Sequence, residues 1–212
     1  MRAFSAGVAL VLSGVALLGC DGASARAKSS GPNGESSSPL SSVRVEAANV
    51  DFELPDFELV DQDNRPFKKA DLAGKAWVVD FVFTTCPSVC PAMTKKMSAL
   101  AKELSPRADV GLLTITVDAE NDTPEKMKSF AEQNGGLSPS WRLLTGEPQK
   151  VDTLIQKGFL SGIRRGTDKL DIAHSERFVL VDTRAHVRGL YSTDEAGLAE
   201  LKKAIDRALS SR

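Results

Sequence analysis

Residues 77–91 read WVVDFVFTTCPSVCP, and this stretch decides the fold class. Its first part, up to Phe83, is rich in β-branched and aromatic residues, which is typical of a buried β-strand. Its second part carries two cysteines, and Pro91 suits the first turn of a helix. The stretch therefore predicts a strand that passes through a cysteine-bearing turn into a helix. Open α/β sheets bind their ligands at junctions of this kind.

The rest of the chain alternates between strand and helix patterns. We predict strands at 77–83, 110–117, 141–144, 177–182 and 187–191, and helices at 91–104, from Thr123, at 148–157 and from Asp194. Thr123 is the expected N-cap of its helix. Met93 and Met97 follow the helical period, so we assign them to the core and not to a metal. Asp80, inside the first strand, is expected to be a paired core polar group and not part of a functional pocket.

The element order β-α-β-α-β-α-β-β-α predicts an α/β protein. Two parallel crossovers followed by a hairpin and a closing helix match a thioredoxin-like sandwich, with the 148–157 helix as an insertion. The pattern by itself leaves other α/β arrangements open. Lys and Arg number 27 and Asp and Glu 28, for a net charge of −1, and there is no basic stripe. The charge therefore argues against a nucleic-acid partner.

Residues 1–20 are interpreted as a lipoprotein signal peptide. A short apolar run ends at Leu17-Leu18-Gly19-Cys20, which is similar to a bacterial lipobox. We expect acylation of Cys20, although a plain signal peptide that ends near this cysteine is the alternative. Residues 21–44, rich in Ser, Gly, Ala and Pro, predict a flexible tether, and 45–212 predict one folded domain. This indicates a lipoprotein that faces the periplasm or the cell exterior, with Asp21 favouring the inner membrane.

Cys86 and Cys90 are the two cysteines that remain if Cys20 is acylated. Pro91 predicts that Cys90 lies near the helix N-cap, where the helix dipole would lower the pKa of its thiol. A purely structural disulfide is one alternative, and it would close only a short loop. An iron–sulfur cluster normally needs four cysteines, and structural zinc usually has four protein ligands. Two thiolates with an imidazole suit copper, especially Cu(I), but the spacing does not decide between copper and a redox dithiol.

Two histidines could supply the imidazole. His174 stands directly before the strand 177–182, and in a thioredoxin-like fold the loop that enters this strand passes beside the cysteine turn. A surface-loop role is the alternative for His174. His186 falls in a hairpin turn and is expected to be solvated and uninvolved. Asp118, at the end of the strand 110–117, is a candidate to orient a ligand, or else to cap the loop that leads to Thr123.

Several motifs occur in order, and together they closely resemble the Sco/SenC family of copper-binding proteins, which serve cytochrome c oxidase assembly. The resemblance covers residues 57–191. The motifs are Phe83-Thr84-x-Cys86-Pro87-x-x-Cys90-Pro91, Thr116-Val117-Asp118, Asp122-Thr123-Pro124, Trp141-x-x-Leu144-Thr145-Gly146, His174-Ser175 and Val179-Leu180-Val181-Asp182. The resemblance implies a thioredoxin-like fold with an added hairpin and helix. It also implies that Cys86, Cys90 and His174 are the copper ligands.

The implied function is that of a metallochaperone that binds one copper ion, Cu(I) or Cu(II), for the CuA-bearing subunit of an oxidase. Another periplasmic copper carrier is a second expected partner. A thiol–disulfide oxidoreductase that uses Cys86 and Cys90 is the alternative, and it is the main enzymatic activity that the sequence leaves open. A redox sensor or weak peroxidase is the third hypothesis. Ser88 and Asn121 stand where many family members have Asp and Arg, which leaves the recipient open.

Overall fold

The computed structural model describes residues 50–159, 164–165, 172–173 and 176–210. Val43–Arg212 group into one compact unit. The predicted acylation site Cys20, the predicted tether 21–44 and the predicted ligand His174 lie outside the described residues. Their roles therefore stay predictions.

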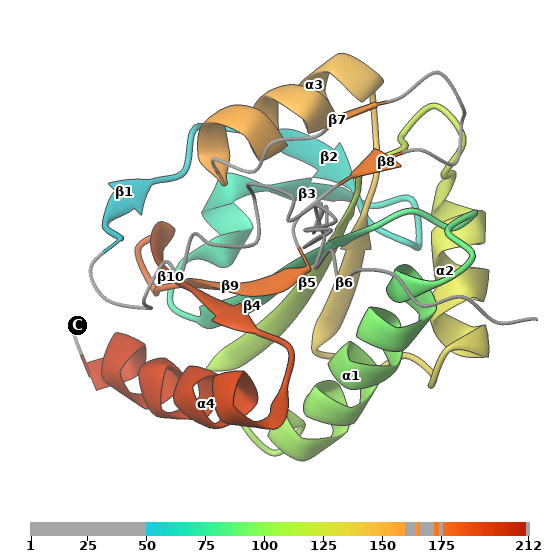
Figure 1. Ribbon diagram of the computed structural model, residues 1–212. Helices are drawn as coiled ribbons and strands as arrows, with labels where there is room; N and C mark the ends of the chain where they lie inside the picture. Colours follow the sequence, from blue (N-terminus) through green and yellow to red (C-terminus); the bar gives the residue numbers. More distant parts are fainter. Residues whose placement is uncertain (1–49, 160–163, 166–171, 174–175, 211–212) are drawn as a thin grey trace, which may run out of the picture. The chain divides into compact units, whose positions relative to one another are not determined.

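A six-stranded mixed sheet forms the centre of the fold (Figure 1). Its strands lie in the order β1, β10, β9, β4, β5, β6. Strands β4, β5 and β6 are parallel, whereas β9 is antiparallel to β4 and β10 is antiparallel to β9. The bounds are Phe52–Glu53 (β1), Ala76–Val82 (β4), Val110–Thr116 (β5), Trp141–Leu144 (β6), Arg177–Val181 (β9) and His186–Ser192 (β10). All five predicted strands are confirmed, with small shifts at their ends.

Strands β4 and β5 form the most deeply buried part of the sheet, and every residue in both is buried. Helices α1, α2 and α4 lie on one side of the sheet and α3 lies on the other (Figure 1). Coverage on both faces explains why these strands are mostly apolar on both sides, with Asp80, Thr114 and Thr116 as buried polar exceptions. Gly111 in β5 pairs with Trp77 in β4, and a Cβ at this glycine would lie 2.5 Å from the indole ring. The glycine therefore leaves the space that the indole occupies.

The helices follow the predicted order. Their bounds are Val89–Leu104 (α1), Pro124–Gln133 (α2), Pro148–Thr153 (α3) and Glu195–Ser210 (α4), with a 3₁₀ turn at Lys69–Leu72 and a π-helical turn at Leu154–Gly158. The predicted helix 148–157 is therefore an α-helix that continues into a π-helical turn. The N-cap role of Thr123 is confirmed, since its side chain accepts a hydrogen bond from the Lys126 amide (3.4 Å). Met93 and Met97 are buried in the core, as predicted.

The start of α1 differs from the prediction. The helix begins at Val89, with Ser88 as its N-cap residue, and not at Pro91. Proline fits any position in the first helical turn, because the amides of that turn have no intrahelical acceptor. Its presence at 91 therefore did not mark the first helical residue. As a consequence, Cys90 lies inside the first turn and not at the cap.

A small hairpin, whose position in the chain the sequence did not predict, covers the edge strand β6. It consists of β2 (Glu58–Val60) and β3 (Pro66–Lys68). Val60 and Thr145 exchange backbone hydrogen bonds of 2.9 and 3.0 Å, and the Gln62 side chain accepts from the Leu143 amide (2.9 Å). These contacts occupy polar groups of β6 that would otherwise be open to pairing with another chain. A second short pair joins β7 (Arg164–Arg165) to β8 (Ile172–Ala173).

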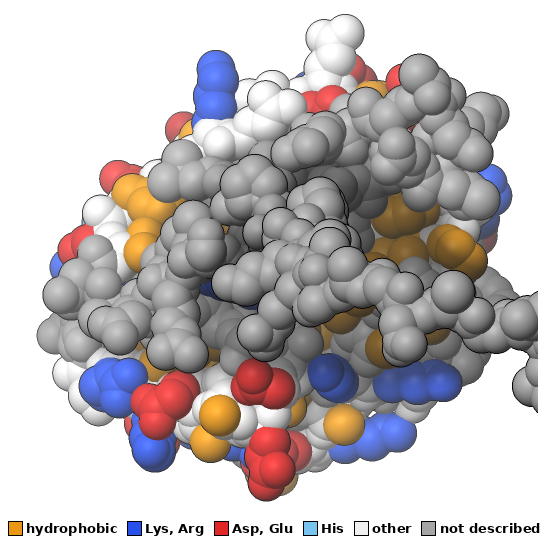
Figure 2. All heavy atoms as spheres, viewed as in Figure 1, with side chains coloured by type: hydrophobic (Ala, Val, Ile, Leu, Met, Phe, Trp, Pro, Cys, Tyr) orange, Lys and Arg blue, Asp and Glu red, His pale blue; other side chains and the backbone are white. Residues whose placement is uncertain are grey.

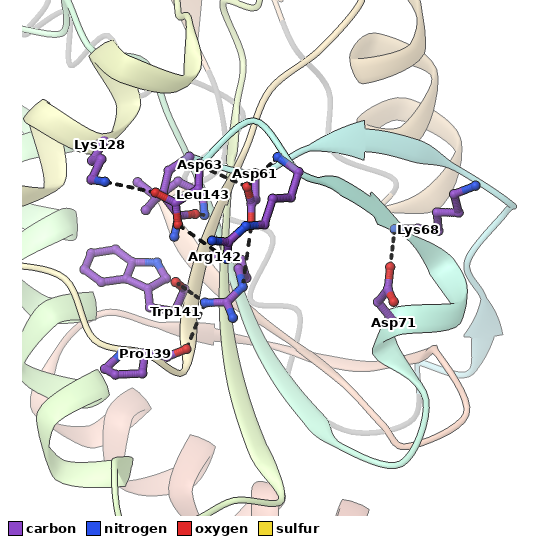
Figure 3. A network of polar contacts seen from close by, with 11 residues as sticks. Asp61, Asp63, Lys68, Asp71, Lys128, Pro139, Trp141, Arg142 and Leu143 are labelled. Carbon is purple, nitrogen blue, oxygen red and sulfur yellow. Dashed lines mark hydrogen bonds and ion pairs between the residues drawn. The ribbon is translucent and has the colours of Figure 1, made fainter.

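The turn of the β2–β3 hairpin is held by polar contacts to α2 and β6 (Figure 3). Asp61 Oδ1 accepts from the amides of Asp63 and Arg65, both at 2.9 Å, and thereby closes the turn. Lys128 of α2 reaches Asp63 at 2.9 Å, and Arg142 of β6 lies 3.8 Å from Asp61 (Figure 3). The hairpin turn is therefore attached both to α2 and to β6.

Charged side chains of both signs mix on the side of the molecule that carries α1 and α4 (Figure 2). An ion pair of 2.6 Å between Lys202 and Glu103 joins these two helices. Among the residues that the structure describes, no helix combines the length and the apolar character needed to cross a membrane.

Candidate metal centre

The two cysteines lie where β4 passes into α1. β4 ends at Val82 and α1 begins at Val89, so Cys86 lies in the connecting turn and Cys90 in the first helical turn. The Cys86 amide donates to the Phe83 carbonyl (3.2 Å), which closes a tight turn directly after the strand. Both cysteines therefore lie at the carboxyl edge of the parallel strands, as the sequence predicted.

The two cysteine residues contact each other within this turn. The Cys90 amide donates to the Cys86 sulfur at 3.4 Å, and both cysteines are free thiols. Cys86 is 7% exposed and Cys90 is 0% exposed. A metal ion or a reacting partner would therefore meet Cys86 first, and Cys90 lies behind it.

The Cys86 thiol is the more acidic of the two. Burial by itself would raise its pKa, because burial penalises the thiolate. Hydrogen bonds from backbone amides and from the Cys90 thiol outweigh burial, so the pKa of Cys86 is lowered from its ordinary value. The amides belong to Ser88, Cys90 and Val89. They form the amino end of α1, where negative charge is favoured.

The Cys90 thiol shows the opposite shift, and the prediction of a lowered pKa for Cys90 is wrong. Burial raises the pKa of Cys90 far above its ordinary value, and neighbouring Cys86 and Asp80 raise it further, against a hydrogen bond with the Phe83 backbone. Cys90 lies within the helix and is fully buried, so the loss of hydration dominates over the helix dipole. The amino end of α1 acts on the sulfur of Cys86 instead.

Asp80 lies in β4 and is fully buried. Its Oδ1 accepts from the Thr114 hydroxyl at 2.5 Å, and this hydroxyl in turn accepts from the Trp141 indole (2.9 Å). Its Oδ2 has no hydrogen-bond partner among the described residues. Burial raises the pKa of Asp80 to about 7. The predicted pairing of this core carboxyl is therefore confirmed for one oxygen only.

A second buried carboxylate, Asp122 in the β5–α2 loop, holds the end of β4. Its Oδ2 accepts from the Thr84 amide (3.1 Å) and the Thr116 hydroxyl (2.6 Å), and its Oδ1 accepts from the Thr84 hydroxyl (2.5 Å). Burial raises the pKa of Asp122, against these hydrogen bonds. The sequence pointed to Asp122 only as part of the motif Asp122-Thr123-Pro124 and did not predict its contact with Thr84. Its position directly before the N-cap Thr123 is the only local signal that it carries.

Asp118 lies four residues before Asp122 in the same loop and is 7% exposed. Both its carboxylate oxygens accept from the Asn121 side chain, at 2.9 and 3.0 Å, and its carbonyl accepts from the amides of Asn121 and Asp122. These contacts close the loop that leads to Thr123. A role in orienting a copper ligand stays a prediction.

The strand that follows His174 in the sequence begins at the cysteine edge, whereas His186 lies at the opposite edge. β9 begins at Arg177 and runs antiparallel to β4, so its first residue lies at the edge where β4 ends. The turn before His186 lies at the opposite edge, and His186 Nδ1 is 2.7 Å from Asp51. Within the described ranges, no group of three or more His, Cys, Asp and Glu side chains is arranged to hold a metal ion.

The sheet order, the helix positions and the cysteine pair define a thioredoxin-like α/β protein with a Cys-x₃-Cys site at a strand–helix junction. The family described as SCO1/SenC matches residues 46–210, and the chain belongs to this family. The predicted family is therefore confirmed.

Related structures and proteins agree with this assignment. The structure of a SCO1/SenC family lipoprotein from Bacillus anthracis is 30% identical, with a TM-score of 0.69 over 76% of this chain and 99% of that chain. A second similar structure is that of BsSco, which is described as a member of the Sco family of cytochrome c oxidase assembly proteins with a disulfide switch. It is 27% identical, with a TM-score of 0.69 over 78% of this chain and 98% of that chain. A protein of Stutzerimonas stutzeri, named as a candidate copper-binding protein, is 29% identical over 64% of this chain and 67% of its own length. The predicted thioredoxin-like fold with an added hairpin is confirmed.

Proposed function

We propose that this protein is a copper carrier for the assembly of a respiratory cytochrome c oxidase. It binds one copper ion as cargo through Cys86, Cys90 and His174 and delivers it to the CuA-bearing subunit. The observation that carries the proposal is the pair of free thiols at the β4–α1 junction, linked by the 3.4 Å contact from the Cys90 amide to the Cys86 sulfur. Family membership and the named functions of the related proteins support it.

The chemistry of the donors fits Cu(I). Thiolates are soft ligands, which favour soft metal ions, and Cu(I) is one of these. The amides at the amino end of α1 favour the Cys86 thiolate before a metal arrives. Cys90 gives up its proton when the metal binds, because a metal ligand must be deprotonated. The site therefore presents the more acidic Cys86 thiol first, with the less acidic Cys90 thiol behind it.

The place of His174 in the sequence supports its role as third ligand. It stands three positions before Arg177, where β9 begins at the edge that carries the cysteines. His186 makes a matched comparison, because it is the only other histidine in the chain and is held by Asp51 at the opposite edge. Three ligands leave one side of a copper ion open to a thiolate of the recipient, so transfer proceeds by ligand exchange without release of free copper.

Copper titration of the exported chain, purified in detergent under anaerobic reducing conditions, tests this proposal. We expect one Cu(I) ion per chain, a weaker affinity in His174→Ala and no change in His186→Ala. In Cu(II) titrations after removal of the reductant, we expect an altered Cu(II) spectrum in His174→Ala only. A different stoichiometry, or equal behaviour of the two histidine variants, would count against the proposal.

Thiol–disulfide exchange is the second candidate function, and the unequal acidity of the two thiols favours it. The Cys86 thiolate would attack a disulfide of an apo-oxidase subunit and form a mixed disulfide, releasing one recipient thiolate. Cys90 would then attack the Cys86 sulfur, passing its proton to the second departing recipient thiolate. Two electrons thereby move from the cysteine pair to the recipient. Full oxidase assembly in cells that carry His174→Ala, with none in Cys86→Ser, would favour this function over copper transfer.

We propose that acylated Cys20 attaches the protein to the inner membrane, with the folded domain on the periplasmic or outer side. The tether 21–44 would let the domain reach both the oxidase subunit and a second periplasmic copper carrier that supplies the metal. The lipoprotein from Bacillus anthracis supports this proposal as a relative. Two or three acyl chains would hold the protein on the membrane more firmly than one chain would.

A further inference from the structure

Thr84 is the point at which the cysteine turn is attached to the rest of the fold. Asp122 accepts from both the amide and the hydroxyl of Thr84. The next residue back, Phe83, accepts the amide of Cys86 through its carbonyl. The start of the turn is therefore held by Asp122, and its closure by a backbone hydrogen bond.

We propose that Asp122 is a positioning residue of the copper site, which sets the place of Cys86 through Thr84 without touching the metal. The inference rests on the proposed copper-binding function. Asp122 is suited to this task because it is 1% exposed and all three donors reach its two oxygens. A buried carboxylate whose hydrogen bonds are all satisfied holds its donors rigidly, so Thr84 is kept in one position.

The backbone of Asp122 is itself anchored from two sides. The Asp122 amide donates to the Asp118 carbonyl (2.9 Å), and the Asp122 carbonyl accepts from the Thr145 hydroxyl (2.6 Å). Thr145 also exchanges backbone hydrogen bonds with Val60 in the added hairpin. The place of Cys86 therefore depends on two neighbouring loops at the same sheet edge, those that follow β5 and β6.

Replacement by asparagine removes this arrangement while nearly conserving the volume. An asparagine side chain has one acceptor oxygen, and its NH₂ group is a donor. In Asp122→Asn the amide oxygen can keep the two donors on Oδ2, but the NH₂ group then faces the Thr84 hydroxyl, which must turn from donor to acceptor. Thr84 would then be held by neutral hydrogen bonds, which are weaker than those to a carboxylate, and the turn would gain freedom at the residue two positions before Cys86.

Asp61 provides a matched control. It is 4% exposed, and its Oδ1 accepts two backbone amides that close the β2–β3 turn. Asp61→Asn is thus the same change at a buried carboxylate that holds a different loop. Thr84→Val and Thr84→Ser form a second matched pair, because only the serine keeps the hydroxyl that donates to Asp122.

Two measurements on the exported chain test the inference. The first is Cu(I) affinity by competition with bicinchoninate, and the second is the rate at which iodoacetamide alkylates Cys86 in metal-free protein with Cys90→Ser. Loss of a group that orients a metal ligand typically lowers affinity by about 10- to 100-fold. We expect a loss of this size and an altered alkylation rate in Asp122→Asn, a smaller change in Thr84→Val, and values near wild type in Asp61→Asn and Thr84→Ser.

Several results would overturn the inference. Affinity and alkylation rate in Asp122→Asn within about threefold of wild type would do so, since orienting groups contribute more than this. An equal loss in Asp61→Asn would indicate general destabilisation instead. If Asp122→Asn does not fold, the Thr84 pair decides, and equal behaviour of valine and serine overturns the inference. If the wild type binds no Cu(I), the proposed function fails, while the alkylation rates still test the positioning role separately.

Discussion

The buried carboxyl of Asp80 makes the free energy of unfolding depend on pH in a direction that can be tested. Its pKa is about 7 in the folded protein against an ordinary value of 3.8, because burial penalises the charged form. The folded-state pKa lies above the unfolded value, so the unfolded chain loses this proton first. The folded protein therefore loses stability as the pH rises from about 4 to about 7.

The size of the effect follows from the shift. One pKa unit corresponds to about 1.4 kcal/mol, so the rise from 3.8 to about 7 gives a total loss of about 4 kcal/mol. Between pH 5 and pH 8 the loss is about 3 kcal/mol. Asp80→Asn cannot ionise and should remove this slope. Its absolute stability is less informative, because a buried amide without a partner costs about 1–3 kcal/mol.

Urea unfolding followed by the fluorescence of Trp77 and Trp141 measures the slope at intervals from pH 5 to pH 8. The wild-type and Asp80→Asn chains are compared in a metal-free Cys86→Ser/Cys90→Ser background, so that neither thiol ionisation nor copper contributes. Glu120→Gln, which removes an exposed carboxylate, is the control and should keep the wild-type slope. Equal pH slopes in the wild type and Asp80→Asn would refute the reasoning and mean that Asp80 is not buried as the structure has it.

Three further predictions concern other parts of the chain. In the reduced, metal-free protein, iodoacetamide should modify Cys86 before Cys90, because Cys86 has the lowered pKa and the greater exposure; peptide mass mapping at early times checks this, and equal rates would contradict it. Gly111→Ala should destabilise the fold by about 1–3 kcal/mol, because its Cβ would lie 2.5 Å from the Trp77 ring; an unchanged urea midpoint would show that the core adapts. Cys20→Ser should move the exported protein from the membrane fraction to the soluble fraction on cell fractionation, and full retention on the membrane would argue against acylation.

Most of the central sheet and the helix order could be predicted because their signals are local. The run from Trp77 to Phe83 contains its own evidence for a buried strand, and the pair Thr123-Pro124 marks a helix start. The resemblance implied an added hairpin, but the position of β2 and β3 was missed, because three-residue strands are too short to establish a period. The start of α1 was misplaced, because Pro91 fits more than one position in the first turn.

The sequence by itself determined the family, the α/β class and the placement of both cysteines between a strand and a helix. Only the tertiary structure decided which thiol is acidic, because that depends on burial and on which sulfur receives the amides of α1. The link from Asp122 to Thr84 also comes from the fold, since 38 positions separate the two residues in the chain. Periodicity and capping involve neighbours in sequence, whereas hydration and long-range hydrogen bonds exist only once distant segments are packed together.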